Sequence, residues 1–145
     1  MQILVKHFSE LSLEQLYDML RLRAEVFVVE QNCVYQDLDN LDQDAWQLLG
    51  YEGETLIATA RILKPGSHYT MPAIGRVVTA QSHRNQSAGK AIFQAAVDET
   101  KRLFPNQPIK IMAQSYLIKF YSAFGFKIVS EEFLEDGIPH VEMEF

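Results

Sequence analysis

The stretch Ile74–Gly89, IGRVVTAQSHRNQSAG, decides the fold. Its apolar start predicts a strand over Ile74–Thr79, and the small polar residues that follow lead into a long helix from Ser87 to just before Pro105. The first N–H groups of a helix lack partners within the helix, and its dipole attracts anions. Arg84–Gly89 is therefore a candidate phosphate-binding loop, although an ordinary helix start after a strand fits the same pattern.

Strands and helices alternate on both sides of this stretch. Ser12 and Gln15 form a capping box for a helix that runs to about Val29, and a shorter helix ends at Gly125. The expected further strands are Gln2–Phe8, Trp46–Tyr51, Thr55–Leu63, Ile109–Met112, Phe126–Val129 and Val141–Phe145. A loop over Glu135–Pro139 is expected between the last two. This order predicts one α/β domain over residues 1–145, with a mixed central sheet flanked by helices.

Composition excludes several classes of function. The 145 residues are 48% hydrophobic and carry 13 basic and 19 acidic side chains, for a net charge of -6. A nucleic-acid binder would show a basic field, whereas an acidic surface suits a positively charged amine. No apolar stretch is long enough to cross a membrane. A single cysteine, Cys33, forms no internal disulfide, which favours a reducing, cytoplasmic compartment.

Two familiar ligand motifs fail on inspection. Gly89-Lys90 resembles the end of a phosphate loop, but Arg84 stands where that motif needs glycine and Ala91 replaces its Ser or Thr. The acidic segment from Asp37 lacks the glycine and the final glutamate of a calcium loop. The four histidines have no metal-binding spacing. We therefore expect no metal.

A second informative segment is Gln114–Phe126, QSYLIKFYSAFGF. Tyr121 lies on the apolar stripe of the short helix, with Gly125 as its C-cap. A tyrosine in this position is either a packed aromatic whose hydroxyl finds a partner or a catalytic hydroxyl.

Together these segments resemble the GNAT acetyltransferase superfamily. Arg84–Gly89 matches its acetyl-CoA loop, R/Q-x-x-G-x-G/A, except that Ser87 replaces the first glycine. Tyr121–Phe126 matches its later Y-x-x-x-G-F element. The resemblance is closer to the ElaA-like branch. The matching stretches are Leu22-Arg23, Val26–Cys33, Tyr35–Asp37, Ala60–Lys64, Ile74–Val77, Ala113-Gln114, Phe120-Tyr121, Phe124–Phe126 and Glu135–His140.

This resemblance implies a GNAT fold and acetyl-CoA as cosubstrate. The pantetheine arm would pair with the strand at Val77, Val78 and Thr79. The diphosphate would lie on the loop and helix start, made of Arg84, Asn85, Gln86, Ser87, Ala88, Gly89 and Lys90. Gln114 stands where the family often has an asparagine that bonds the cofactor.

The chemistry implied is direct attack of a primary amine on the thioester in a ternary complex. Tyr121 would protonate the leaving thiolate, and a strand amide near Val78 would meet the developing oxyanion. Glu30, at the end of an apolar helix, is the leading candidate for the base, and Asp37 is the second choice. Acceptor-binding candidates are Tyr35, Asp37, Arg76 and His140.

Alternatives to this chemistry stay open. The Glu30–Asp44 segment also fits a solvated acidic surface, and Arg23, Arg76 and His140 also fit structural roles. Cys33 offers a covalent route, but nothing beside it in sequence indicates thiolate activation. The rival functions are a catalytically silent GNAT domain that binds acyl-CoA or a protein, and an α/β interaction domain without cofactor. The sequence does not fix the oligomeric state, so a homodimer stays open.

Overall fold

The computed structural model describes residues 1–145 without a gap and has one mixed sheet of eight strands. The strands are β1 (Gln2–His7), β2 (Trp46–Glu52), β3 (Thr55–Leu63), β4 (Ala73–Thr79), β5 (Lys110–Gln114), β6 (Lys127–Ile128), β7 (Phe133–Glu135) and β8 (Ile138–Glu144). Their order in the sheet is β1-β2-β3-β4-β5-β8-β6, with β7 paired to β8. The mixed α/β architecture expected from the sequence is confirmed.

Three α-helices accompany the sheet: α1 (Leu13–Arg23), α2 (Ala88–Leu103) and α3 (Ile118–Ser122). The capping box that was expected before α1 is present, because Gln15 N–H donates to Ser12 Oγ at 3.1 Å and Ser12 N–H donates to Gln15 Oε1 at 3.0 Å. The helical path continues to Glu30 as expected, but residues Ala24–Glu30 wind as a π-helix. Wide turns of this kind recur at functional sites.

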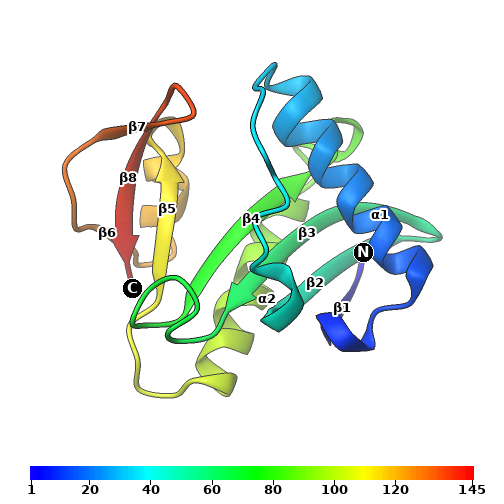
Figure 1. The fold of residues 1–145 in the computed structure, drawn as a ribbon, viewed down its shortest axis with the longest axis horizontal. Coiled ribbons are helices and arrows are strands. Elements are labelled where there is room, and N and C mark those ends of the chain that lie inside the picture. The colour runs from blue at the N-terminus through cyan, green and yellow to red at the C-terminus, as the bar shows by residue number, and fades with distance from the viewer.

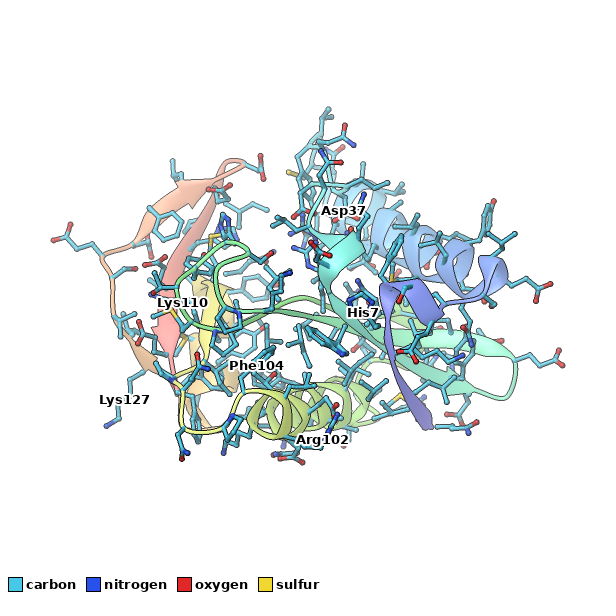
Figure 2. The ribbon with its side chains drawn as sticks, turned by 60° about the horizontal axis from the view of Figure 1, so that its bottom comes forward. His7, Asp37, Arg102, Phe104, Lys110 and Lys127 are labelled. Carbon is cyan, nitrogen blue, oxygen red and sulfur yellow. The ribbon has the colours of Figure 1, made fainter.

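Helices cover both faces of the sheet, as Figures 1 and 2 show. α1 packs on one face of β3 and β4 through a cluster that includes Met19, Leu22 and Val78. α2 and α3 lie on the other face, over a larger core that includes Ile92, Phe93 and many residues of β2 to β5 and β8. The buried apolar positions that predicted α2 are the ones that face this core.

The C-terminal strands depart from the expectation. Asp136 and Gly137 have φ of 52° and 77°, so they form the two-residue turn of a β-hairpin between β7 and β8. The prediction of a loop over Glu135–Pro139 was therefore wrong, since its ends belong to the two strands. The alternation of apolar and polar residues that predicts a strand is not visible in Phe133–Glu135, because this strand is short and mostly exposed.

The central feature of the sheet is a separation between β4 and β5. These parallel strands pair only at Ala73 and Lys110, and beyond that point they diverge (Figure 1). Each strand has a full antiparallel partner on its other side. The rest of the β4 edge that faces β5 therefore has no strand beside it.

Candidate active site

A cleft of about 620 Å³ lies where β4 and β5 diverge. Val77 of β4, Gln114 of β5 and Tyr121 of α3 line it. Loop residues 31–36 and the β7–β8 turn line it as well. The cleft thus receives chain segments from both ends of the sequence.

A second hollow of about 340 Å³, called here the loop pocket, lies at the start of α2. Its lining residues are Thr79, His83, Arg84, Asn85, Ser87, Ala88, Gly89, Lys90 and Phe120. Thr79 is only two residues beyond Val77 of the cleft, on the same strand. The exposed edge of β4 therefore leads from the loop pocket into the cleft. Of the residues expected to bind the cofactor, Gln86 lines neither hollow, and the Val78 side chain is buried in the α1 core.

The loop pocket depends on two left-handed residues. Asn85 has φ of 67° and Ser87 has φ of 64°, a region that disfavours most side chains but suits glycine. Ser87 therefore adopts the conformation for which the related motif uses glycine. Its side chain makes no capping hydrogen bond. The first N–H groups of α2 are left without a side-chain partner beside the pocket.

Arg84 and Glu30, expected in different roles, are paired with each other. Two guanidinium nitrogens of Arg84 lie 2.5 and 2.9 Å from the Glu30 carboxylate oxygens, and the same side chain donates twice to the carbonyl of Thr79. Glu30 does not line the cleft. A carboxylate held in this way is not placed to take a proton from an amine, and Arg84 has its charge matched. Lys90 is the exposed cation of the loop pocket that has no recorded ion pair.

Tyr121 is buried, with 8% of its surface exposed, and its ring packs edge-on against Phe93 at 5.0 Å between centroids. The packed-aromatic alternative expects a partner for its hydroxyl, but the structure records no hydrogen bond from it within the protein, and the side chain opens onto the cleft. Burial raises the pKa of Tyr121 to about 12. The hydroxyl is therefore protonated at neutral pH and available as a donor.

Beneath the other side of the cleft lies the charge cluster, defined as Arg23, Asp37, Asp39, Asp42, Arg61 and Arg76. Arg23 Nε lies 2.9 Å from Asp37 Oδ2, and its Nη1 lies 2.7 Å from Asp42 Oδ1. Arg61 joins Asp39 to Asp42. The cluster has three positive and three negative side chains, so its net charge is zero. The alternative of a solvated acidic surface is wrong for Asp37, because it is 4% exposed and paired with Arg23 and Arg76.

Arg76 connects the charge cluster to the cleft. On β4, Arg76 and Val77 oppose the single residue Ala60 of β3, which is a β-bulge, and Arg76 has φ of 49°. Its Nε lies 2.7 Å from Asp37 Oδ1, and its Nη2 donates to the carbonyl of Asp37 at 2.9 Å. These contacts hold the left-handed backbone at the point where β4 turns from β5.

The other residues expected at the acceptor site do meet in the cleft. Tyr35, Arg76 and His140 all line it. Burial raises the pKa of Tyr35, whose hydroxyl donates to Asp37 Oδ1 at 3.2 Å. Cys33 also lines the cleft, with its Sγ 3.6 Å from the carbonyl oxygen of Asp136, and no histidine or lysine is recorded as its hydrogen-bond partner.

Several lining residues escaped the sequence analysis. Phe93 forms part of the cleft wall, and His68 and Tyr69 reach it from the β3–β4 loop. Phe93 gave only a core signal, and an exposed loop gives no periodic signal at all. No three His, Cys, Asp or Glu side chains gather as a metal site. None of the helices is both long and apolar enough to span a bilayer.

The chain thus combines a mixed α/β sheet with an open strand edge that leads from a helix start into a cleft, and comparisons with known proteins identify the class to which this fold belongs. The family model for the acetyltransferase (GNAT) domain matches residues 8–145. The chain belongs to this GNAT acetyltransferase family.

Within the family the chain is similar to ElaA. Protein ElaA of Escherichia coli is 42% identical over 139 residues, which cover 94% of this chain and 91% of the relative. The crystal structure of E. coli ElaA superimposes with a TM-score of 0.93 over 99% of this chain and 97% of that one. An acyl-CoA N-acyltransferase from Pseudomonas aeruginosa, 38% identical, gives a TM-score of 0.93 with 99% of both chains covered.

Proposed function

We propose that the protein is an N-acetyltransferase that moves an acetyl group from acetyl-CoA to a primary amine. The observation that carries this proposal is the free edge of β4 between the loop pocket and the cleft. Two residues separate Val77 from Thr79, so about 7 Å of extended strand joins the two hollows. A pantetheine arm hydrogen-bonded to that edge would bring its thioester into the cleft, with its diphosphate on the first amides of α2.

The residues of the cleft then divide the chemistry. The amine nitrogen attacks the thioester carbonyl directly, and an amide of the bulged strand near Val78 or Thr79 meets the developing oxyanion. Tyr121 donates to the leaving thiolate sulfur, because its hydroxyl is protonated at neutral pH. Gln114 lines the same cleft and offers its amide to the cofactor. No covalent enzyme intermediate is required, so Cys33 has no chemical step.

The acceptor side favours a cation. Because the charge cluster is balanced internally, it neither attracts nor repels a charged ligand strongly. The cleft residues Glu135 and Asp136 are exposed carboxylates with no recorded ion pair. They raise the local concentration of an ammonium group, an effect that salt weakens. Tyr35, Arg76 and His140 shape the rest of the acceptor side, whereas Asp37 has no free carboxylate to offer.

A two-stage experiment tests the proposal. Calorimetry measures binding of CoA and acetyl-CoA, and CoA release is then followed with n-butylamine, agmatine, spermidine and a lysine-containing peptide. Transfer to at least one amine supports the enzyme. Binding of CoA without any transfer supports the silent GNAT domain instead. Absence of binding at millimolar CoA contradicts both and favours an interaction domain.

Paired lysine variants locate the diphosphate. Lys90→Gln removes the exposed cation of the loop pocket, so CoA affinity should fall several-fold, and the loss should shrink in high salt. Lys127→Gln removes an exposed lysine at the far edge of the sheet (Figure 2) and should leave affinity unchanged. Equal affinity for both variants and wild type would place the diphosphate elsewhere.

A further inference from the structure

We propose that His140 is the base that takes the proton from the acceptor amine. This assignment rests on the proposed transferase function and names a residue of that same site. It replaces Glu30 and Asp37, the carboxylates that the sequence favoured. Three features favour the histidine: the tautomer of its ring, its place in the cleft and the ion pairs that engage the competing carboxylates.

One ring nitrogen of His140 is fixed as a donor. Nδ1 lies 2.7 Å from the carbonyl oxygen of Ile138, and a carbonyl oxygen only accepts hydrogen bonds. Nδ1 must therefore carry hydrogen. In the neutral imidazole Nε2 is then the bare, proton-accepting nitrogen, and no partner within the protein is recorded for it. A buried ring held in this tautomer is prepared to accept a proton.

The ring is also held in place at the cleft. His140 is 8% exposed and stacks on Phe133, with 6.1 Å between ring centroids and 22° between planes. It lies directly opposite Gln114 in the β5–β8 ladder, so both side chains are on one face of the sheet. Gln114, Tyr121 and His140 all line the cleft. The proposed acid and base thus share one cavity, on different elements.

The competing carboxylates are poorly suited. Glu30 is bound to Arg84 outside the cleft, and Asp37 is enclosed by Arg23 and Arg76. Exposed carboxylates have low proton affinity, because their ordinary pKa is near 4. A neutral imidazole is the better match to neutral pH.

The proton balance is simple. The bound ammonium first releases one proton to solvent. The neutral amine nitrogen then forms the C–N bond as the C–S bond breaks, and the electron pair of that bond goes to sulfur. The amine proton passes to His140 Nε2, and the thiolate receives the Tyr121 hydroxyl proton. The imidazolium proton then returns to the tyrosinate through solvent. The products are an amide and CoA thiol, with both side chains in their starting forms.

Several titratable groups line the cleft around the histidine or lie on β5 and β8, among them His68 and Tyr69 of the β3–β4 loop. Others are Glu135 and Asp136 of the hairpin, Glu142 of β8, Lys110 of β5, Tyr121 of α3, and Cys33, Tyr35 and Arg76 of the opposite cleft wall. Lys110 is bound to Glu142 and Glu144, and Arg76 to the charge cluster. The charged groups among these that lack a recorded ion pair, Glu135 and Asp136, are acidic.

The test replaces His140 by asparagine, whose amide N–H can still donate to the Ile138 carbonyl while the basic nitrogen is lost. On the amine that the wild type acetylates fastest, kcat/KM should fall about 100-fold. The wild-type decline toward acid pH should disappear, activity should rise with added imidazole, and CoA affinity should not change. His7→Asn, on the distant strand β1, should behave as wild type. A His140→Asn enzyme with wild-type rate and pH profile overturns the assignment.

A second measurement does not need turnover. Nitrogen chemical shifts of the His140 ring in the resting protein should report hydrogen on Nδ1 and a bare Nε2 above the pH at which the ring titrates. The opposite tautomer overturns the proposal even where His140→Asn is slow. Wild-type protein that acetylates no amine contradicts the transferase function itself, and with it the reaction that needs this base.

Discussion

The two sides of the active site are built in different ways. Apart from Phe120 of α3, the loop pocket on the cofactor side comes from one continuous segment, from the end of β4 through the loop into α2. This segment presents main-chain groups and small residues. The acceptor side is assembled from the π-helix, the 31–41 loop, the β3–β4 loop and the β7–β8 hairpin, and it contains charged and aromatic side chains. The first is local and exposed, whereas the second is non-local and rests on buried ions.

Substitutions on the two sides should therefore affect different properties of the protein. Changes on the cofactor side should alter affinity for CoA while leaving the fold intact, because the groups that matter are exposed backbone amides. Changes beneath the acceptor side should first destabilise the protein, because the charge cluster joins α1, the 31–44 loop, β3 and β4. Substitutions on each side can test this contrast between CoA affinity and stability.

The largest expected effect is on stability. Arg23→Met removes the most deeply buried cation of the charge cluster and leaves Asp37 and Asp42 with fewer partners in a dry environment. The free energy of unfolding should fall by about 3 kcal/mol. Urea denaturation followed by circular dichroism measures it. Arg21→Met is the matched control, because its ion pair with Glu25 is exposed and contributes about 0.5 kcal/mol or less. Similar losses in both variants would mean that the buried cluster has no special structural weight.

The next effect is catalytic. Tyr121→Phe removes one hydroxyl and keeps the ring packing against Phe93. If the hydroxyl donates to the leaving sulfur, kcat should fall by about 10- to 1,000-fold while the affinity for acetyl-CoA stays constant. Steady-state kinetics and calorimetry separate the two. Wild-type turnover in this variant would return Tyr121 to a purely packing role.

The cofactor side could be predicted from the sequence better than the acceptor side. Residues 74–89 contain a strand, a loop and a helix start in immediate succession, so their geometry follows from local rules and the phosphate-binding hypothesis could be made. The detail that escaped was conformational. Serine as a residue type does not predict the φ of 64° found at Ser87. Only its position, where the related motif has glycine, indicates a left-handed conformation.

The charge cluster beneath the acceptor side escaped prediction because its contacts are long-range. Asp37 and Asp42 seemed to belong to a solvated loop, since acidic runs usually do. Their partners, Arg23, Arg61 and Arg76, come from three other elements, and no spacing rule joins them. His140 was named as a candidate for acceptor binding, but its fixed tautomer depends on the bend of the β7–β8 hairpin, which was expected to be a loop.

Acid titration should sharpen the contrast further. Burial alone would raise the pKa of Asp39, but hydrogen bonds and attraction from Arg61 outweigh it and lower this pKa from 3.8 to about 2. The pKa of Asp42 is also lowered, because Arg23 and Arg61 outweigh its burial. As pH falls from about 4 to 2, the unfolded chain therefore binds protons first, and stability declines. Urea midpoints measured across this range should fall less steeply in Asp39→Asn than in wild type. Parallel curves would show that Asp39 is not coupled to folding.

The smallest effect is expected at Ser87. A left-handed φ costs an ordinary residue roughly 1 kcal/mol, and glycine removes that cost but loses a similar amount through its flexibility when unfolded. Ser87→Gly should therefore change the free energy of unfolding by less than about 1 kcal/mol and keep CoA affinity within a few-fold of wild type. Ser87→Val is the matched opposite, because a β-branched side chain resists φ near 64°, so the loop should shift and CoA binding should weaken strongly. Calorimetry on both variants decides the role of the residue. A large loss of affinity in Ser87→Gly would mean that the serine hydroxyl itself contacts the diphosphate, and the cofactor side would then depend on a side chain as well as on its backbone.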